Sequence, residues 1–451
     1  MREKGKTHKA SRREFIELLT AGSVGATAAW VGAGSAVEQA RAGTLTGDRS
    51  RYKIYSPGRI GTLKLKNRLV RSAAYEGGGL PTGEVNADML RMHRAYAEGG
   101  VSLTITGYMA VMEYGKKGTH VCAFDDRFIP GLTKLADTVH KVGNDCKIAA
   151  EIGHDGTSVS SRRSDKVDEP VLISPTGGQW PARIGPSSLN WQGENEGHVM
   201  TVAEIQRFCE DMGQAARRVK EAGFDAVEIH GAHHYLIDTF LSPYTNRRTD
   251  DYGGSLKNRV RIVAEVVQQI RQQAGRNFPI LIKLNCDDGP IHQGISGETD
   301  IHTFPALVRE VVRAGVDAID VSGSQKPGDP LRTNISDPKD QSFYRAFAEA
   351  IDVKIPVILG CGNRNVELLE KIMHTGRVDF FCFARPMVRE PNLAKRWLEG
   401  QGGPASECTN SSLCFRELYV TGGPARCVVL ARMRGEAAQV LSEEKSTGYG
   451  V

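Results

Sequence analysis

Side chains that can move protons and stabilise an oxyanion lie together in one short segment, His230-Gly231-Ala232-His233-His234-Tyr235. Imidazole N–H groups can stabilise a developing oxyanion, and a phenol can deliver a proton. We therefore predict that the imidazoles and Tyr235 form an acid and oxyanion-stabilising set, with His230 and Tyr235 facing one pocket. A three-histidine metal site is the competing interpretation of this segment.

This segment begins in one of eight apolar, β-rich runs that recur along the chain. Stretches with helical periodicity lie between the runs, and four of them are followed by a glycine placed for a left-handed helix cap. These stretches are residues 202–222, 256–274, 301–314 and 364–375, followed by Gly223, Gly275, Gly315 and Gly376. The runs themselves are residues 69–74, 102–107, 147–152, 226–231, 280–285, 318–323, 356–361 and 380–385.

The alternation of strand and helix predicts an α/β fold, namely a (β/α)8 TIM barrel, with an open doubly wound sheet as the alternative. In such barrels the active site lies at the carboxyl ends of the strands. The third run ends near Glu151, and the fifth run carries Lys283. We therefore expect both side chains to face the same barrel mouth as the histidines.

The loops after the seventh and eighth runs indicate a phosphate site. Glycine-rich backbone over residues 360–364 offers N–H donors, and Arg385 can add a charge-assisted hydrogen bond. For either loop alone, a glycine-rich turn beside a surface arginine is the alternative.

The composition excludes several classes of protein. Hydrophobic residues make up 40% and charged residues 25% of the chain, a mixture typical of a folded protein. Lysine and arginine number 58 against 53 acidic residues, and the first 19 residues account for most of that excess. The rest is nearly neutral, so we expect no nucleic-acid partner, which would need a concentrated basic face.

The amino terminus has the layout of a bacterial twin-arginine signal. Arg12 and Arg13 precede a weakly apolar stretch over residues 18–37, and Ala40-Arg41-Ala42 offers a cleavage site. We expect residues 1–42 to direct the chain to the twin-arginine export machinery and the periplasm, with a membrane anchor or a core helix as alternatives. We predict no stable membrane span in the rest of the chain.

Taken with its longer motifs, the sequence resembles the old yellow enzyme family of FMN-dependent ene reductases. The resemblance runs from about residue 54 to residue 398, and its most specific passages are residues 66–70, 185–187, 222–230, 240–255 and 385–391. It places an FMN-binding barrel over residues 50–400 and leaves residues 401–451 as a C-terminal tail.

The resemblance also implies roles for individual residues. His230 and His233 would hold the carbonyl oxygen of a small-molecule substrate, Tyr235 would protonate its α carbon, and Lys283 would lie near flavin N1 and O2. FMN is the implied cofactor, and NAD(P)H is a candidate reductant. The other implied cofactor contacts are Ser72, Ala73, Ala74, Tyr75, Gly107, Tyr108, Glu151, Gly362, Asn363, Ala384 and Arg385.

Several positions depart from the family pattern. Ser72-Ala73-Ala74-Tyr75 stands where a Pro-Met/Leu-Thr/Cys motif is usual, His234 replaces a common glycine, and Glu151 replaces the glutamine that bonds the pyrimidine edge of the flavin. In the tail, three cysteines resemble the remnant of an iron–sulfur ligand set, with Ser411 at the expected middle position. A tail that packs by the barrel, or that pairs two thiols, is the favoured interpretation of Cys408, Cys414 and Cys427.

We therefore expect a flavoenzyme that reduces an activated alkene such as an enone. The alternatives are an oxidative dehydrogenase or demethylase of amines with the same barrel, and a non-catalytic flavin-binding protein. Export would separate the enzyme from the cytoplasmic nicotinamide pools, so an exported enzyme would need a different electron donor.

Overall fold

The computed structural model describes residues 49–113, 120–158, 171–173, 179–181, 183–189, 197–288, 299–323, 335, 337–421 and 423–434. The predicted signal, residues 1–42, lies outside the described residues, as does the end of the tail from residue 435. Within the described part, no helix has both the length and the apolar character needed to cross a membrane.

Eight parallel strands form a closed barrel. They are β3 (Leu69–Arg71), β4 (Leu103–Ile105), β6 (Lys147–Gly153), β11 (Ala226–Gly231), β12 (Ile280–Asn285), β13 (Ala318–Ser322), β14 (Val357–Leu359) and β15 (Phe380–Phe383). Each strand pairs with the next along the chain, and the pairings of β15 with β3 and of β6 with β11 complete the ring. The predicted TIM barrel is confirmed, and the open sheet is excluded.

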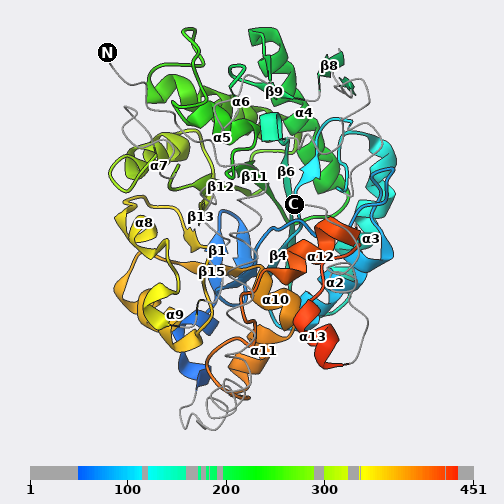
Figure 1. Cartoon of the computed structure of the whole chain (residues 1–451), viewed down its shortest axis with the longest axis vertical. Coiled ribbons are helices and arrows are strands. Elements are labelled where there is room, and N and C mark those ends of the chain that lie inside the picture. The colour runs from blue at the N-terminus through cyan, green and yellow to red at the C-terminus, as the bar shows by residue number, and fades with distance from the viewer. Residues whose placement is uncertain are drawn as a thin grey trace, which may run out of the picture.

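Helices follow the strands and surround the barrel (Figure 1). They are α2 (Ala87–Glu98), α3 (Ile129–His140), α4 (Val202–Glu221), α5 (Leu236–Leu241), α6 (Leu256–Gln273), α7 (Phe304–Arg313), α8 (Arg345–Ala350), α9 (Val366–Thr375), α10 (Arg385–Arg389), α11 (Leu393–Leu398), α12 (Leu413–Thr421) and α13 (Val428–Met433). The short strands outside the ring are β1 (Gly58–Ile60), β2 (Leu63–Leu65), β5 (Met109–Ala110), β7 (Val171–Ile173), β8 (Gln179–Pro181), β9 (Ile184–Gly185) and β10 (His198–Val199).

Local sequence signals fix the ends of the long helices. α4 begins with a capping box, in which the Thr201 hydroxyl accepts from the Glu204 N–H and the Glu204 carboxylate accepts from the Thr201 N–H. The glycines at 223, 275 and 315 adopt the predicted left-handed conformation, with φ of 89°, 95° and 101°. The prediction is wrong for Gly376, whose φ of −119° and ψ of −172° let the chain leave α9 in an extended conformation.

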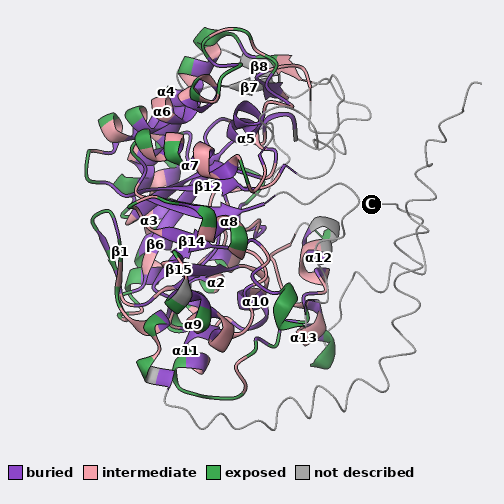
Figure 2. Cartoon of the chain, turned by 90° about the vertical axis from the view of Figure 1, so that its left-hand side faces the viewer, coloured by how far each residue is buried: buried purple, intermediate pink, exposed green. Residues whose placement is uncertain are grey.

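The barrel interior is layered, because side chains alternate between the two faces of each strand. The first inward layer is apolar and packs against the β1–β2 hairpin, so this hairpin covers the amino-terminal end of the barrel. Its members are Val70, Leu103, Ala149, Ala226, Leu281, Ala318, Ile358 and Phe380, in contact with Ile60, Leu63 and Leu65. Figure 2 shows the hairpin on one side of the buried core and the tail helices α12 and α13 on the opposite side.

Two residues further along four of the strands, the inward layer becomes charged. This second layer consists of Glu151, Glu228, Lys283 and Asp320, none of them more than 3% exposed. Because the first layer and the hairpin fill the other end, these side chains and the polar residues above them are open to a ligand only from the carboxyl ends of the strands.

Candidate active site

Lys283 lies at the centre of the charged layer. Its Nζ donates to Asp320 Oδ2 at 2.6 Å and to Glu228 Oε2 at 2.7 Å, and lies 3.3 Å from Glu151 Oε2. Strand register explains the meeting, since Lys283 pairs with Asp320 across β12 and β13, and Glu228 pairs with Glu151 across β11 and β6. One ammonium group is thus surrounded by three carboxyl groups.

The pKa values of these groups follow from burial and from one another. Burial alone would lower the pKa of Lys283, but Asp320, Glu228 and Glu151 hold it well above its usual value. Desolvation, together with the negative charge of Asp320 and Glu151, raises the pKa of Glu228 well above the ordinary range. Burial would also raise the pKa of Glu151, but His230 and Lys283 outweigh it and lower that pKa. Lys283 and Glu151 are therefore ionised at neutral pH, while Glu228 tends to hold its proton.

His230, Tyr235 and Tyr108 form an aromatic cluster above the charged layer. The His230 ring is 4.6 Å from Tyr235 between centroids, edge to face, and stacks on Tyr108 at 6.0 Å. His230 Nδ1 lies 3.1 Å from Glu151 Oε2, and the Tyr108 hydroxyl donates to Asp155. The predicted acid and the predicted oxyanion donor are therefore brought together by the end of β11 and the start of α5.

His233 lies in the same loop between β11 and α5. Its ring centroid lies 5.2 Å from that of His230, and its Nε2 is 2.8 Å from Ser322 Oγ at the end of β13. Desolvation, together with the neighbouring His230 ring and the positive charge of Lys283, lowers the pKa of His233 well below its usual value. Its backbone φ of 59° is left-handed, which is uncommon for a residue other than glycine and turns the chain sharply toward α5.

The loop after β3 approaches the end of β4 closely. A Cβ built on Gly107 would lie 2.5 Å from the carbonyl oxygen of Ala74, so only glycine fits there. The Gly107 N–H donates to Glu76 Oε2 at 3.1 Å, and the Tyr75 ring lies 4.6 Å from that of His120. Ser72 and Ala73, in the same loop, are buried next to the barrel end.

The residues predicted to bind phosphate differ in whether their polar groups already bond within the chain. Asn363 is used internally, because its amide donates to the carbonyls of Leu359 and Cys382 at 2.7 and 3.1 Å. Gly362 has a φ of 76°, and a Cβ there would meet the Phe343 ring at 2.6 Å. Ala384 caps α10, whose first residue, Arg385, donates from Nη1 to Ser412 Oγ at 2.6 Å.

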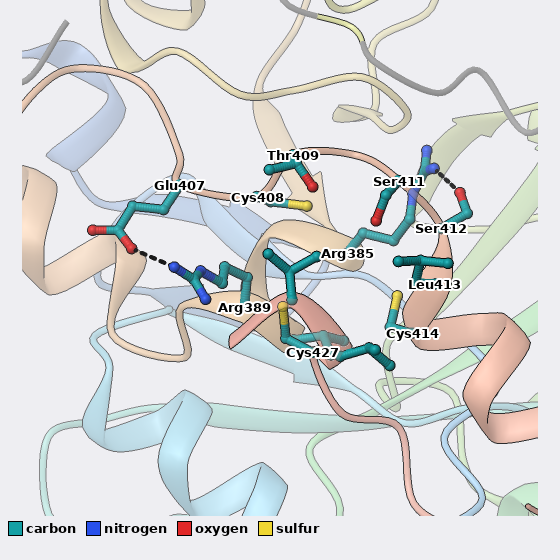
Figure 3. Close-up of a pocket in the computed structure, with 13 residues that line it drawn as sticks. Arg385, Arg389, Glu407, Cys408, Thr409, Ser411, Ser412, Leu413, Cys414 and Cys427 are labelled. Carbon is teal, nitrogen blue, oxygen red and sulfur yellow. Dashed lines mark hydrogen bonds and ion pairs between the residues drawn. The ribbon is translucent and has the colours of Figure 1, made fainter. Parts of the chain in front are cut away.

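Arg385 also lines a pocket between α10 and the tail (Figure 3). The three tail cysteines, Cys408, Cys414 and Cys427, line the same pocket together with Ser411. All nine cysteines are free thiols, so the alternative in which two tail thiols are paired is not what the structure has. The tail instead packs on the barrel, where the Ala425 N–H donates to the Glu76 carbonyl at 2.9 Å.

The metal interpretations gain no support from the side-chain arrangement. In the described part of the chain, no group of three or more histidine, cysteine or acidic side chains is placed to hold a metal ion. This applies both to the histidines at and after the end of β11 and to the tail cysteines. His154 uses its Nδ1 within the chain, where it accepts the Gly156 N–H at 2.8 Å, and burial lowers its pKa to about 3.

The barrel mouth fits FMN, the expected cofactor. His230 Nε2 makes no hydrogen bond with any described residue although the side chain is 4% exposed, so it is available to a ligand. The close approach of Ala74 to Gly107 brings the backbone of the loop after β3 against the end of β4 at the mouth. Glu151 and Lys283 supply polar atoms beneath the mouth, and Arg385 supplies a cation beside it.

Sequence reasoning missed two acidic residues of the inner layer and a second buried cluster. Glu228 and Asp320 could have been found, because each is a charged residue at an inward position of an otherwise apolar run. The second cluster, outside the barrel wall, consists of Arg71, Glu76 and His93. Glu76 follows a strand end in a loop, and nothing in the local pattern pairs it with α2.

Comparison with known proteins identifies the family. A sequence profile of the NADH:flavin oxidoreductase / NADH oxidase family matches residues 53–401. The chain is 31% identical over 396 residues to a metal reductase of Desulforamulus reducens, which covers 88% of this chain and 56% of that protein. It is 30% identical over 403 residues to the 4,4'-dithiodibutanoate disulfide reductase of Rhodococcus erythropolis, covering 83% of this chain and 94% of that protein.

The fold has close structural counterparts. The structure of the old yellow enzyme from Pichia sp. AKU4542 matches with a TM-score of 0.61 at 21% identity, over 84% of this chain and 96% of that one. The chain spans about half the length of several curated relatives, including the N,N-dimethylglycine/sarcosine dehydrogenase of Chromohalobacter salexigens, which is 29% identical and matched over 81% of this chain and 51% of its own length. Since the profile covers most of the sequence and the barrel mouth suits a flavin, the chain belongs to the NADH:flavin oxidoreductase / NADH oxidase family and is an oxidoreductase with FMN as its cofactor.

Proposed function

We propose that the chain reduces the activated C=C bond of an enone-type acceptor. The observation that carries the proposal is the meeting of Tyr235 with His230 and His233 at the barrel mouth, with ring centroids 4.6 and 5.2 Å from His230. A phenol beside two imidazoles is suited to protonate carbon while a carbonyl oxygen gains negative charge. Bound FMN, once reduced, would supply the hydride that the β carbon accepts.

Each residue then has a separate task. His230 Nε2, which makes no hydrogen bond with the described residues, can face the substrate oxygen. His233 is held by Ser322, and its lowered pKa keeps the ring neutral, so its N–H acts as a dipole rather than as a charge. Tyr235 leads into α5, whose buried residues fix the position of its backbone. Ser72, Ala73, Ala74, Tyr75, Gly107, Tyr108, Glu151, Lys283, Gly362, Asn363, Ala384 and Arg385 are proposed to hold the cofactor.

Replacing Tyr235 with phenylalanine tests this division of labour. Reduction of bound FMN by NAD(P)H should stay nearly intact, while reoxidation by an enone should slow by about 10²–10⁴-fold, the usual contribution of a general acid. Stopped-flow spectroscopy of the two half-reactions separates them. Tyr252→Phe, which removes a hydroxyl that bonds Glu265 at 2.8 Å, is the matched control. A Tyr235→Phe enzyme that reduces enones normally, but whose FMN is reduced slowly, would contradict the proposal.

Oxidation of a methylated amine is the second candidate. It is favoured by the similarity to N,N-dimethylglycine/sarcosine dehydrogenase and by the absence of the usual Pro-Met/Leu-Thr/Cys motif over residues 72–75, after β3. The carboxyl groups beneath the mouth would also suit a cationic substrate. Anaerobic reduction of the flavin by sarcosine or dimethylglycine, without turnover of cyclohexenone, would favour this candidate over the first.

We also propose that the chain is exported by the twin-arginine route. The support is the Arg12-Arg13 pair ahead of a weakly apolar stretch and a small-residue cleavage site. Arg12→Lys combined with Arg13→Lys should leave the protein in the cytoplasm with residues 1–42 uncleaved. Cell fractionation with immunoblotting measures this, and unchanged export of the double variant would contradict it.

A further inference from the structure

The charged layer inside the barrel holds more negative than positive groups. Lys283 is its only lysine or arginine, and its ammonium group is bonded to Asp320 at 2.6 Å and to Glu228 at 2.7 Å. Glu151 is the third carboxyl group, 3.3 Å from the same Nζ. These side chains are nearly inaccessible to solvent, so water cannot screen their charges.

The remaining charge falls on Glu151. The Lys283 charge is balanced first by Asp320, its shortest contact, and Glu228 tends to hold its proton. Cys382 approaches Asp320 Oδ1 with its Sγ at 3.5 Å, and desolvation keeps that thiol protonated. His230, with Nδ1 at 3.1 Å, is the other group that faces the Glu151 carboxylate. A buried carboxylate thus stands at the position where the resemblance expects a neutral glutamine against the pyrimidine edge of the flavin.

This charge matters because flavin reduction changes the charge of the cofactor. Oxidised FMN accepts two electrons and one proton, so the reduced cofactor carries one more negative charge than the oxidised one. A nearby fixed carboxylate disfavours the added charge, and the effect is strong where the effective dielectric is low. A glutamine at the same position would add no such opposition.

We propose that Glu151 sets the reduction potential of the bound FMN, holding it lower than a neutral side chain would. Glu151 acts in this way through its charge alone and takes no part in proton transfer to the substrate. The consequence for function is a reduced flavin that is a stronger electron donor than one beside a neutral side chain. The inference rests on the FMN cofactor and is independent of which acceptor the enzyme uses.

The test is a potentiometric titration of the purified holoprotein with dithionite, without substrate. Glu151→Gln should raise the midpoint potential, because one buried negative charge is removed. A unit charge within about 10 Å, at an effective dielectric of about 20, changes an equilibrium by about tenfold or more. For a two-electron couple, a tenfold change in the equilibrium constant corresponds to a shift of about 30 mV in the midpoint potential. By linkage, the affinity for reduced FMN relative to oxidised FMN should rise by the same factor, which fluorescence titration of the apoprotein measures independently.

Two further variants separate charge from hydrogen bonding. Glu151→Met removes the charge without adding an amide donor, so it should raise the potential as Glu151→Gln does. Glu228→Gln replaces a carboxyl group that tends to keep its proton, and it should shift the potential much less. A potential that is unchanged or lower in Glu151→Gln, or that rises in the Gln but not in the Met variant, overturns the proposal.

A fourth variant tests the proposal even if the Glu151 variants fail to retain FMN. Asp320→Asn releases Lys283 from its shortest ion pair, so the potential should rise if the surplus of carboxylates holds it low. An unchanged potential in Asp320→Asn would overturn the proposal. Because no substrate is present, these results stand whether or not the enzyme reduces enones.

Discussion

Two buried charge clusters flank the barrel wall, and they differ in balance. The outer cluster lies between β3 and α2, where the Glu76 carboxylate meets the Arg71 guanidinium and His93 Nε2. A backbone N–H, that of Gly107, also donates to this carboxylate. The inner cluster sets three carboxyl groups around the ammonium group of Lys283. The outer cluster pairs its one carboxylate with an arginine, whereas the inner cluster has more carboxyl groups than cations.

The difference indicates which cluster serves the fold and which serves a ligand. Burying a charge is costly unless partners replace its hydration, so a balanced cluster is stable without help from outside the chain. The outer cluster ties the loop after β3 to the end of β4 and thereby shapes the mouth. The inner cluster retains a surplus carboxylate directly beneath that mouth, where its field acts on whatever binds there.

The largest expected effect comes from breaking the balanced cluster. Arg71→Ala should lower the free energy of unfolding by about 3–5 kcal/mol, because it leaves the Glu76 carboxylate buried without its cation. Urea denaturation of the holoprotein measures this change. Arg91→Ala is the matched control, since it breaks an exposed ion pair with Asp88 at 2.5 Å and should cost at most about 1 kcal/mol. Equal losses in the two variants would show that the outer cluster does not hold the fold.

Arg385 is also a charged group without an opposite charge beside it, but here the unpaired charge is positive. Among the described residues its guanidinium has no carboxylate within ion-pair distance, and its Nη1 donates to the neutral Ser412 hydroxyl at 2.6 Å. An unbalanced cation beside the mouth suits the FMN phosphate. Arg385→Ala should weaken FMN binding by about 1.5–3 kcal/mol, the usual worth of a hydrogen bond to a charged group.

Equilibrium dialysis of FMN measures the effect of Arg385→Ala. Ser412→Ala is its control, because it removes the neutral partner and leaves the cation in place. FMN affinity that falls in Ser412→Ala but not in Arg385→Ala would show that this arginine does not serve the phosphate.

Most of the fold could be predicted from the strand pattern, because an apolar run of five or six residues between two helices can form little else than a buried strand. The runs at 226–231 and 280–285 coincide with β11 and β12. The run at 69–74 ends three residues early, at Arg71, because the chain turns inward where Ala74 approaches Gly107. Gly376 fails as a left-handed cap because nothing in the sequence tells whether a chain leaving a helix turns or extends.

The candidate site was partly visible in the sequence for a similar reason. His230, His233 and Tyr235 are close in sequence, so a single loop brings them together. The partners of Lys283 come from β6, β11 and β13, and their meeting depends on strand register, which emerges only when the barrel closes. Arg71 and Glu76 meet across a loop, and neither lies in a pattern that predicts an ion pair.

Glu76→Gln tests the pH behaviour of the balanced cluster. Burial alone would raise the pKa of Glu76, but Arg71 and His93 outweigh it and lower that pKa in the folded state. The carboxylate therefore stabilises the fold above its unfolded pKa of about 4.3, and this contribution is lost as the pH falls through the folded value. Glu76→Gln should cost about 1.5–3 kcal/mol at pH 7, and the deficit should shrink below about pH 4. Urea unfolding from pH 3 to pH 8 measures the trend, which a deficit independent of pH would contradict.

Glu228→Gln should show the reverse dependence with a smaller effect. Desolvation and the nearby Asp320 and Glu151 raise the pKa of Glu228 in the folded state, despite the opposing attraction of Lys283. The stabilising contribution of such a group is complete below the unfolded pKa of about 4.3 and is lost as the pH rises through the folded value. The glutamine variant does not titrate and retains a carbonyl acceptor for Lys283. The two proteins should therefore differ by about 1 kcal/mol or less near pH 4, and the variant should gain on the wild type from there up to pH 9. Urea unfolding of both holoproteins across this range decides the matter. If Glu228→Gln instead loses stability as the pH rises, as an ionised and well-paired carboxylate would require, then Glu228 shares the Lys283 charge fully and the inner cluster is less unbalanced than its geometry indicates.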